Sequence, residues 1–114
     1  MNRPAAKRLH IGALRHRLVL EHALRNPDGG GGADKTWTAV AEIWAAIDPV
    51  KGSETVVAEA VAGRVLFSVH IRYRNDVVPA MRFRLGSRIF EILAVLDADD
   101  RRRFLKCLTQ ERGL

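Results

Sequence analysis

Apolar and polar residues alternate in successive stretches of the second half of the chain. In Val65–Tyr73 the odd-numbered positions are apolar and the even-numbered ones are mostly polar. A period of two is typical of a β-strand with one buried face. Met81–Leu85 repeats the alternation, and Arg88–Leu96 adds an apolar run after a tight turn at Gly86 and Ser87. The pattern predicts three consecutive antiparallel strands.

Three further segments also favour strands. Ala13–His22 alternates with its leucines on one face, and Arg101–Thr109 places Leu105 and Cys107 inward. Thr36–Ile47 fits a period of two; its alanines would permit a helix, but its Trp, Thr, Val and Ile residues favour a strand. About six strands predict a mainly β fold, a small antiparallel β-barrel or sandwich.

One short α-helix is predicted at Glu54–Ala62. Ser53 supplies an N-cap, valines and alanines form an apolar stripe, and Gly63 follows the last helical residue. Such a helix would cover one side of the barrel. Residues 1–10 are interpreted as a flexible basic N-terminal arm and residues 11–114 as a single β-barrel domain.

A long glycine-rich loop is predicted between the first two strands. Four consecutive glycines with proline and aspartate beside them fit no regular element and indicate a flexible segment. The loop is longer than a tight hairpin needs, so it is either slack or functional. It comprises Asn26, Pro27, Asp28, Gly29, Gly30, Gly31, Gly32, Ala33, Asp34 and Lys35.

Charge is unevenly distributed over the 114 residues, whose formal net charge is +6. Residues 1–17 hold five bases and no acid, residues 18–63 hold three bases and seven acids (net −4), and residues 64–114 hold eleven bases and six acids (net +5). This polarity suits contacts with further copies of the chain or with stacked partners through complementary patches. The plainer interpretation is a solvated surface of uneven charge.

The sequence indicates no enzyme and no cofactor. The single cysteine, Cys107, fits a reducing compartment and a core position. His10, His16 and His22 share strand parity but lie too far apart to bind one metal, and no zinc pattern is present. No serine or threonine has an activating context, and the glycine run lacks a following Gly-Lys-Ser/Thr. Without a secretory core or a membrane-spanning run, the chain is expected to be made in the cytoplasm.

Five arginines lie on the polar faces of the second-half strands, where they could bind nucleic acid. Single-strand binders interleave such cations with exposed aromatics, whereas Phe67, Tyr73 and Phe83 alternate opposite to the arginines and are expected to face the core. The arginines could instead pair with acids of a neighbouring subunit or line a passage for a polyanion. They are Arg72, Arg74, Arg82, Arg84 and Arg88.

An ordered set of short motifs resembles a known family. Gly12-x-Leu14-Arg15-His16-Arg17 opens the set, followed by Trp37, Ile43-Trp44-Ala45, Pro49, Gly52-x-Glu54, His70-Ile71-Arg72-Tyr73-Arg74, Met81-Arg82, Arg88-Ile89-Phe90-Glu91-Ile92 and Asp100-Arg101-Arg102. Their order and spacing over roughly residues 11–111 resemble the head–tail joining proteins of tailed bacteriophages. These are also called head-completion or stopper proteins, and they have relatives in gene transfer agents.

The resemblance implies a structural virion protein rather than an enzyme. It implies a homo-oligomeric ring in the neck of the particle, with the portal or adaptor ring above and the tail terminator or tail tube below. Such a ring completes the DNA-filled head, helps to retain the genome and docks the tail. Its subunits could contact the packaged DNA non-specifically, and no contact with a membrane is expected. The loop Asn26–Lys35 is then a candidate channel loop, although it carries no obvious plug residue.

A subunit interface is predicted from the charge balance. The five arginines are expected to meet acids of neighbouring subunits, with Glu42, Asp48 and Glu54 as candidate partners. The alternative function is an OB-like single-stranded nucleic-acid-binding module, and a weaker one is a basic adaptor of the ribosome or a polymerase. Exposed aromatics on the arginine face would favour the nucleic-acid module.

Overall fold

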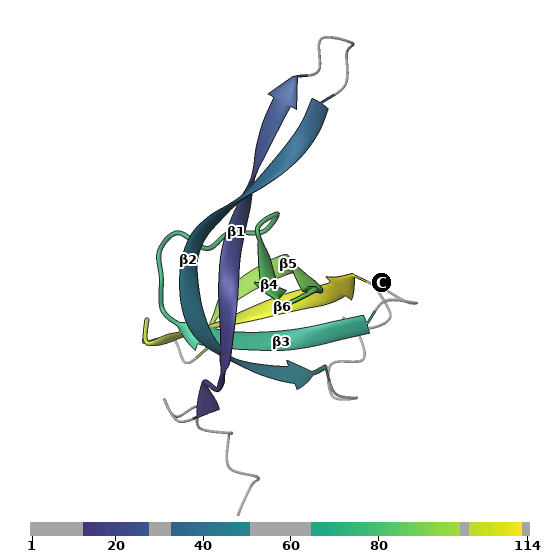
Figure 1. The fold of residues 1–114 in the computed structure, drawn as a ribbon. Coiled ribbons are helices and arrows are strands. Elements are labelled where there is room, and N and C mark those ends of the chain that lie inside the picture. Colours follow the sequence, from purple (N-terminus) through teal and green to yellow (C-terminus); the bar gives the residue numbers. More distant parts are fainter. Residues whose placement is uncertain (1–12, 28–32, 51–64, 99–100, 113–114) are drawn as a thin grey trace, which may run out of the picture.

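The computed structural model describes residues 13–27, 33–50, 65–98 and 101–112. These residues form six strands and no α-helix, so the predicted mainly β fold is confirmed (Figure 1). The helix predicted at Glu54–Ala62 and the N-terminal arm lie outside the described residues. The strands are β1 (His16–Pro27), β2 (Ala33–Pro49), β3 (Val65–Arg72), β4 (Arg82–Leu85), β5 (Arg88–Asp97) and β6 (Phe104–Arg112).

The six strands form one closed antiparallel barrel in the order β1-β2-β3-β6-β5-β4, with β4 pairing back to β1. The three predicted second-half strands are present as β3, β4 and β5, but only β4 and β5 pair with each other, because β3 pairs with β2 and β6. The connection from β3 to β4 is a packed crossing rather than a hairpin, since it buries Val77 and Met81 in the core. A tight turn at Gly86 and Ser87 does join β4 to β5, and the positive φ of 60° at Gly86 suits the first central residue of such a turn.

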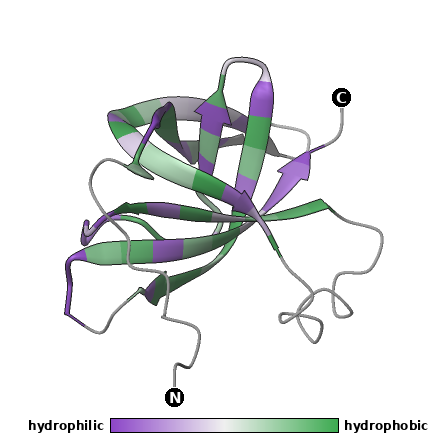
Figure 2. Ribbon diagram, turned by 90° about the horizontal axis from the view of Figure 1, so that it is seen from below, coloured by the Kyte–Doolittle hydropathy of each residue, from purple (hydrophilic) through white to green (hydrophobic). Residues whose placement is uncertain are grey.

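Apolar side chains from all six strands fill the barrel. Ile71 and Phe83 are fully buried, as the alternation predicts, and Phe90 meets Phe67 edge to face with ring centroids 5.6 Å apart. Cys107 is also fully buried, and burial raises the pKa of its thiol to about 12. Figure 2 shows hydrophobic and hydrophilic residues alternating along the strands, as a sheet with one inner face requires.

The aromatic expectation is only partly met. Phe83 faces the core, Phe67 is partly buried against it, and Tyr73 is exposed because it follows the last residue of β3 and its backbone N–H is donated to the carbonyl of Arg103 outside the strand. On β3 the alternation holds only in part, because Leu66 and Ser68 are buried as well as Val69 and Ile71, while Val65 at the start of the strand is exposed.

A β-bulge changes the faces of β2. Leu20 lies opposite Ala41 and the next residue, Glu21, lies opposite Ala39, so Val40 is the extra residue. One extra residue moves every side chain beyond it to the other face of the sheet. Ala45 is consequently in the core, whereas Trp37 belongs to the opposite face, although a period of two had placed both on one face.

The hairpin of β1 and β2 continues well beyond the barrel (Figure 1). β1 pairs with β4 only from Val19 to Glu21, and the two hairpin strands pair with each other as far as Pro27 and Ala33. We call residues His22–Pro27 and Ala33–Thr38 the projecting hairpin. From Glu21 to Pro27 it extends about 20 Å at the usual strand rise.

The predicted loop Asn26–Lys35 is therefore too long at both ends. Asn26 pairs with Asp34 and Arg25 with Lys35, so five of the ten predicted loop residues belong to strands. Cross-strand pairing extends the ladder until only residues 28–32, which carry the glycines, separate the two strands, and these lie outside the described residues.

Candidate functional site

Three charged side chains form a compact cluster where the projecting hairpin leaves the barrel. The Arg82 Nε donates to Glu21 Oε1 at 2.7 Å, and the Arg84 Nε donates to Glu21 Oε2 at 3.0 Å. The Glu21 side chain is only 7% exposed, and both of its oxygens are engaged. A charged group that is this buried needs such partners, because an unpaired buried carboxylate is strongly unfavourable.

The local strand pairing explains how the cluster forms. Glu21 lies directly opposite Arg82 across β1 and β4, and Ala23 lies opposite Trp37 across β1 and β2. Cross-strand partners share a face, and the bulge sets Trp37 on the face of Glu21. The guanidinium carbon of Arg82 lies 4.0 Å from the centre of the Trp37 ring, a cation–π contact. We call Glu21, Trp37, Arg82 and Arg84 the hairpin-base cluster.

The hairpin-base cluster keeps Glu21 ionised. Burial acts to raise the pKa of Glu21, but hydrogen bonds and positive charges from Arg82 and Arg84 outweigh burial and hold that pKa below its ordinary value of 4.5. The carboxylate is therefore charged at neutral pH and serves as a structural tie between β1 and β4.

Two of the other predicted interface arginines pair within the chain. Both oxygens of Asp76 accept hydrogen bonds from Arg74, at 2.9 and 2.8 Å, and both oxygens of Glu111 accept from Arg88, at 2.6 and 3.0 Å. These bidentate pairs hold the pKa of Asp76 and of Glu111 below the usual range. Arg72 is exposed, and no acid among the described residues pairs with it.

Within the described residues, these arginines form their ion pairs with acids other than the predicted partners. Glu42 forms an exposed pair with Arg17 at 3.7 Å, and Arg17 also lies 5.0 Å from the centre of the Trp44 ring. Asp48 is partly buried at the end of β2, and Glu54 lies outside the described residues. Contacts of the arginines with acids of another subunit remain a proposal.

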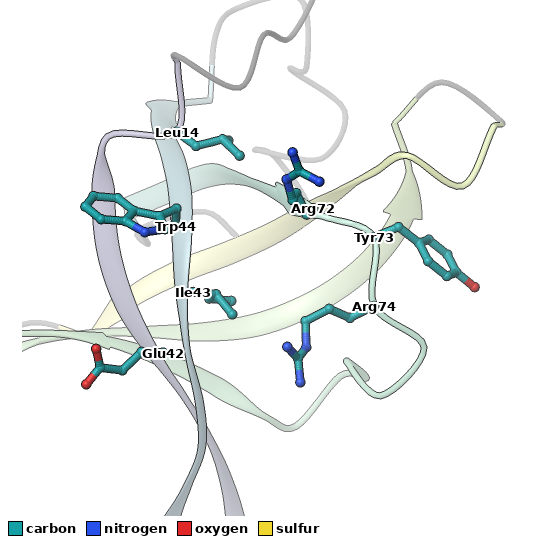
Figure 3. A pocket seen from close by; sticks show the side chains of 7 residues that line it. All are labelled: Leu14, Glu42, Ile43, Trp44, Arg72, Tyr73 and Arg74. Atoms are coloured by element: carbon teal, nitrogen blue, oxygen red, sulfur yellow. The ribbon is translucent and has the colours of Figure 1, made fainter.

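A cleft of about 590 Å³ opens where β2 and β3 separate beyond Ala45 and Ile71. Figure 3 shows Arg72 and Arg74 directed into this space with Leu14 and Ile43, while Trp44 lies across β2 and Tyr73 points away. We call it the β2–β3 cleft. Its lining residues are Leu14, Glu42, Ile43, Trp44, Arg72, Tyr73 and Arg74.

Two of these features were missed by the sequence analysis. Glu21 was counted only as one of many acids, although a carboxylate directly after the apolar residues of β1 is a signal for a partnered charge. The motif Ile43-Trp44-Ala45 was noted, but not that Trp44 is half exposed and lines a cleft. The partners of Glu21 come from the pairing of β1 with β4, and the exposure of Trp44 follows from the end of the β2–β3 pairing at Ala45; neither is marked in the local sequence.

The described residues contain no group of three or more His, Cys, Asp or Glu side chains placed to hold a metal ion. Within the same part of the chain, no helix is long and apolar enough to span a bilayer. The surface of the described residues presents a projecting hairpin with a fixed base, arginines paired with acids, and a cleft that contains Arg72, which pairs with no described acid. Together with the closed barrel, these features define a small β-barrel protein.

Comparison with known proteins identifies the family. Residues 9–112 match the family described as phage head completion protein. A chain in the virion of a native gene transfer agent particle is similar with a TM-score of 0.70 and 35% identity, covering 89% of this chain and 97% of that one. A protein of Shigella flexneri 2a, solved in solution, has a TM-score of 0.73 and 26% identity over 92% of this chain and 98% of its own. A search of curated proteins gave no match.

The chain belongs to the phage head completion protein family. The family match and the gene transfer agent structure confirm the resemblance found in the sequence, with a structural role at the phage head–tail junction and a location in the virion.

Proposed function

We propose that the chain is a head–tail connector subunit that forms a homo-oligomeric ring between the portal or adaptor and the tail. In this position it would complete the filled head, help to retain the DNA and dock the tail. The observation that carries the proposal is the family match over residues 9–112, supported by the 35% identity to a chain of a gene transfer agent virion. The family's role is structural, so we propose no enzymatic activity.

The architecture supports a ring subunit. Each strand of the closed barrel pairs with a neighbour on both sides over part of its length, which limits uncontrolled edge pairing between copies that pack side by side. The projecting hairpin extends beyond the barrel wall and carries the glycine-rich segment at its tip. We propose that this tip, the central part of the predicted loop Asn26–Lys35, reaches the DNA channel.

The arginines fit a ring that conducts DNA without binding it tightly. A wholly basic lumen would bind DNA through counterion release with a steep salt dependence. Here Arg74, Arg82, Arg84 and Arg88 are already partnered by acids of the same chain. We propose that their exposed sides, together with Arg72, contact acids of neighbouring subunits or stacked rings, including Glu42 and Asp48.

The test is complementation of particles that lack the protein. We expect the deletion to yield DNA-filled heads without tails that lose their genome on storage, and the intact gene to restore tailed particles. A variant in which Arg25–Lys35 is replaced by Asn-Gly, which keeps Leu24 opposite Thr36, should be incorporated and dock tails but retain DNA less well. Full DNA retention by this variant would show that the hairpin tip does not close the channel.

The rival nucleic-acid-binding function is tested on the isolated subunit. A connector should bind single- and double-stranded DNA weakly and without sequence preference in a titration at physiological salt. Tight, sequence-selective binding by the subunit, with normal particles formed in its absence, would contradict the connector assignment and favour the single-stranded nucleic-acid module.

A further inference from the structure

We propose that the β2–β3 cleft binds an extended polypeptide segment of a neighbouring virion protein, in which an apolar side chain lies next to a carboxylate. This inference rests on the proposed function, because the neighbour is a component of the same particle. Three independent features of the cleft specify this occupant: a free guanidinium, an apolar lining and an open strand edge.

The guanidinium is that of Arg72. Arg72 and Arg74 lie two residues apart and both enter the cleft in Figure 3. Arg74 is held by both oxygens of Asp76, and Glu42 at the rim is paired with Arg17. Arg72 is therefore the cation of the cleft that forms no ion pair with an acid among the described residues. A carboxylate of a bound segment would pair with its guanidinium through a charge-assisted hydrogen bond.

The lining is apolar on the side opposite this charge. Leu14 and Ile43 project into the cleft (Figure 3). Trp44, which also lines the cleft, is half exposed. Exposed apolar groups collected around a hollow typically mark an interaction site, since burying them on binding removes apolar area from water.

The open edge belongs to β2. This strand pairs with β3 only from Ala45 to Pro49, and from Ala33 to Trp44 no described strand pairs with it on the side away from β1. Such an edge presents unpaired N–H and C=O groups, to which an extended segment can add as a further strand. The added strand would run beside Trp44, and its alternate side chains would enter the cleft beside Arg72.

A polypeptide fits this combination better than DNA does. DNA binding depends on several free cations along the backbone, and the cleft offers one. The apolar lining and the open edge have no counterpart in a phosphate backbone, whereas a peptide supplies backbone hydrogen bonds, an apolar side chain and a carboxylate together.

The experiment is photo-crosslinking in assembled particles. p-Benzoylphenylalanine replaces Trp44, a half-exposed aromatic of the cleft, and in a control it replaces Val65, which is exposed at the opposite end of β3. The crosslinked peptide is identified by mass spectrometry. We expect a crosslink from position 44 to a virion-protein segment with Asp or Glu next to an apolar residue.

Matched arginine variants in the same particles test the charge. Arg72→Gln should lower the crosslink yield from position 44 by about tenfold, the effect of one hydrogen bond to a charged group. Arg72→Lys, which keeps the charge, and Arg74→Gln, whose arginine is already occupied by Asp76, should each lower it by less than about threefold.

Several outcomes would overturn the inference. They are particles that contain the protein but give no crosslink from position 44, a crosslink to DNA, a crosslinked segment without a carboxylate, and a yield that Arg72→Gln leaves unchanged. Absence of the protein from particles would instead overturn the proposed function, and this inference with it.

Discussion

In the barrel, β1 and β2 bury Leu18, Leu20 and Ala45 completely, whereas none of the described side chains of the projecting hairpin is buried to that extent. Leu24 of the hairpin is 49% exposed, and its neighbours on both strands are exposed or only partly buried. The barrel is therefore held by apolar packing. The hairpin is held by its own ladder and, at its base, by one buried carboxylate with two arginines and a tryptophan. One pair of strands is therefore stabilised by two different forces along its length.

The largest effect is expected from truncating the barrel core. Phe83→Ala and Ile71→Ala each remove a fully buried side chain and should lower the free energy of unfolding by about 2–5 kcal/mol, which threatens the fold of a small domain. Chemical denaturation followed by circular dichroism measures the change. An unaltered stability in both variants would mean that apolar packing does not hold the barrel.

The next largest effect is expected at the hairpin base. Glu21→Gln removes the charge that both arginines share and should cost about 2 kcal/mol, less than the ~3–5 kcal/mol typical of a broken buried pair because Arg84 is partly exposed. Amide hydrogen exchange should increase in the projecting hairpin more than in the barrel.

Glu111→Gln is the matched control. It breaks the bidentate pair with Arg88 on β5 and β6, away from the hairpin base, and should cost about 1 kcal/mol or less without a selective change in hairpin exchange. Equal exchange patterns in the two variants would argue against a special role of Glu21.

Acid should weaken the same tie. The pKa of Glu21 is lowered in the folded chain, so its contribution is complete above the unfolded value of about 4.5 and is lost as the pH falls through the folded pKa. Melting temperatures of the parent chain and Glu21→Gln should therefore differ at pH 7 and converge as the pH falls below 4.5 and through the folded pKa. A difference that does not shrink at any pH below 4.5 at which the chain still folds would show that the charge of Glu21 is not the stabilising element.

The smallest effect is expected within the hairpin itself. Leu24→Ala removes a half-exposed side chain and should change the free energy of unfolding by less than about 0.5 kcal/mol. Thermal melts beside those of Phe83→Ala give the contrast directly. A loss comparable to the core variants would reveal packing against Leu24 that the single chain does not contain.

The core was predictable from sequence because a period of two is a local signal. Ile71, Phe83 and Cys107 were assigned to the inside from their neighbours alone, and all three are fully buried. The predicted strands also exist, with shifted ends: β1 begins at His16 rather than Ala13, and β6 runs from Phe104 to Arg112 rather than from Arg101 to Thr109. Strand ends depend on partners across the sheet, which a local pattern does not contain.

The hairpin base could not be predicted for the same reason. The extra residue at Val40 reverses the faces of β2 beyond it, and nothing in the alternation of Thr36–Ile47 marks the position. Without that reversal Trp37 would be assigned to the core, and the contact with Arg82 would be missed. The partner of each arginine is likewise set by barrel closure, which brings Glu21 opposite Arg82 across 61 positions of sequence.

The way the hairpin is anchored has a consequence for how such a subunit can change in evolution. Trp37 is the residue of the hairpin-base cluster that lies nearest the tip of the hairpin. Residues inserted between Trp37 and the tip, and between Ala23 and the tip on β1, therefore leave the contacts of the cluster and the barrel unchanged. One residue added to each strand lengthens the reach by about 3.3 Å and exchanges the two faces of the tip. Two residues added to each strand lengthen it by about 7 Å and preserve the faces. The length of the projecting hairpin can therefore change by equal insertions in its two strands, without any change in the barrel.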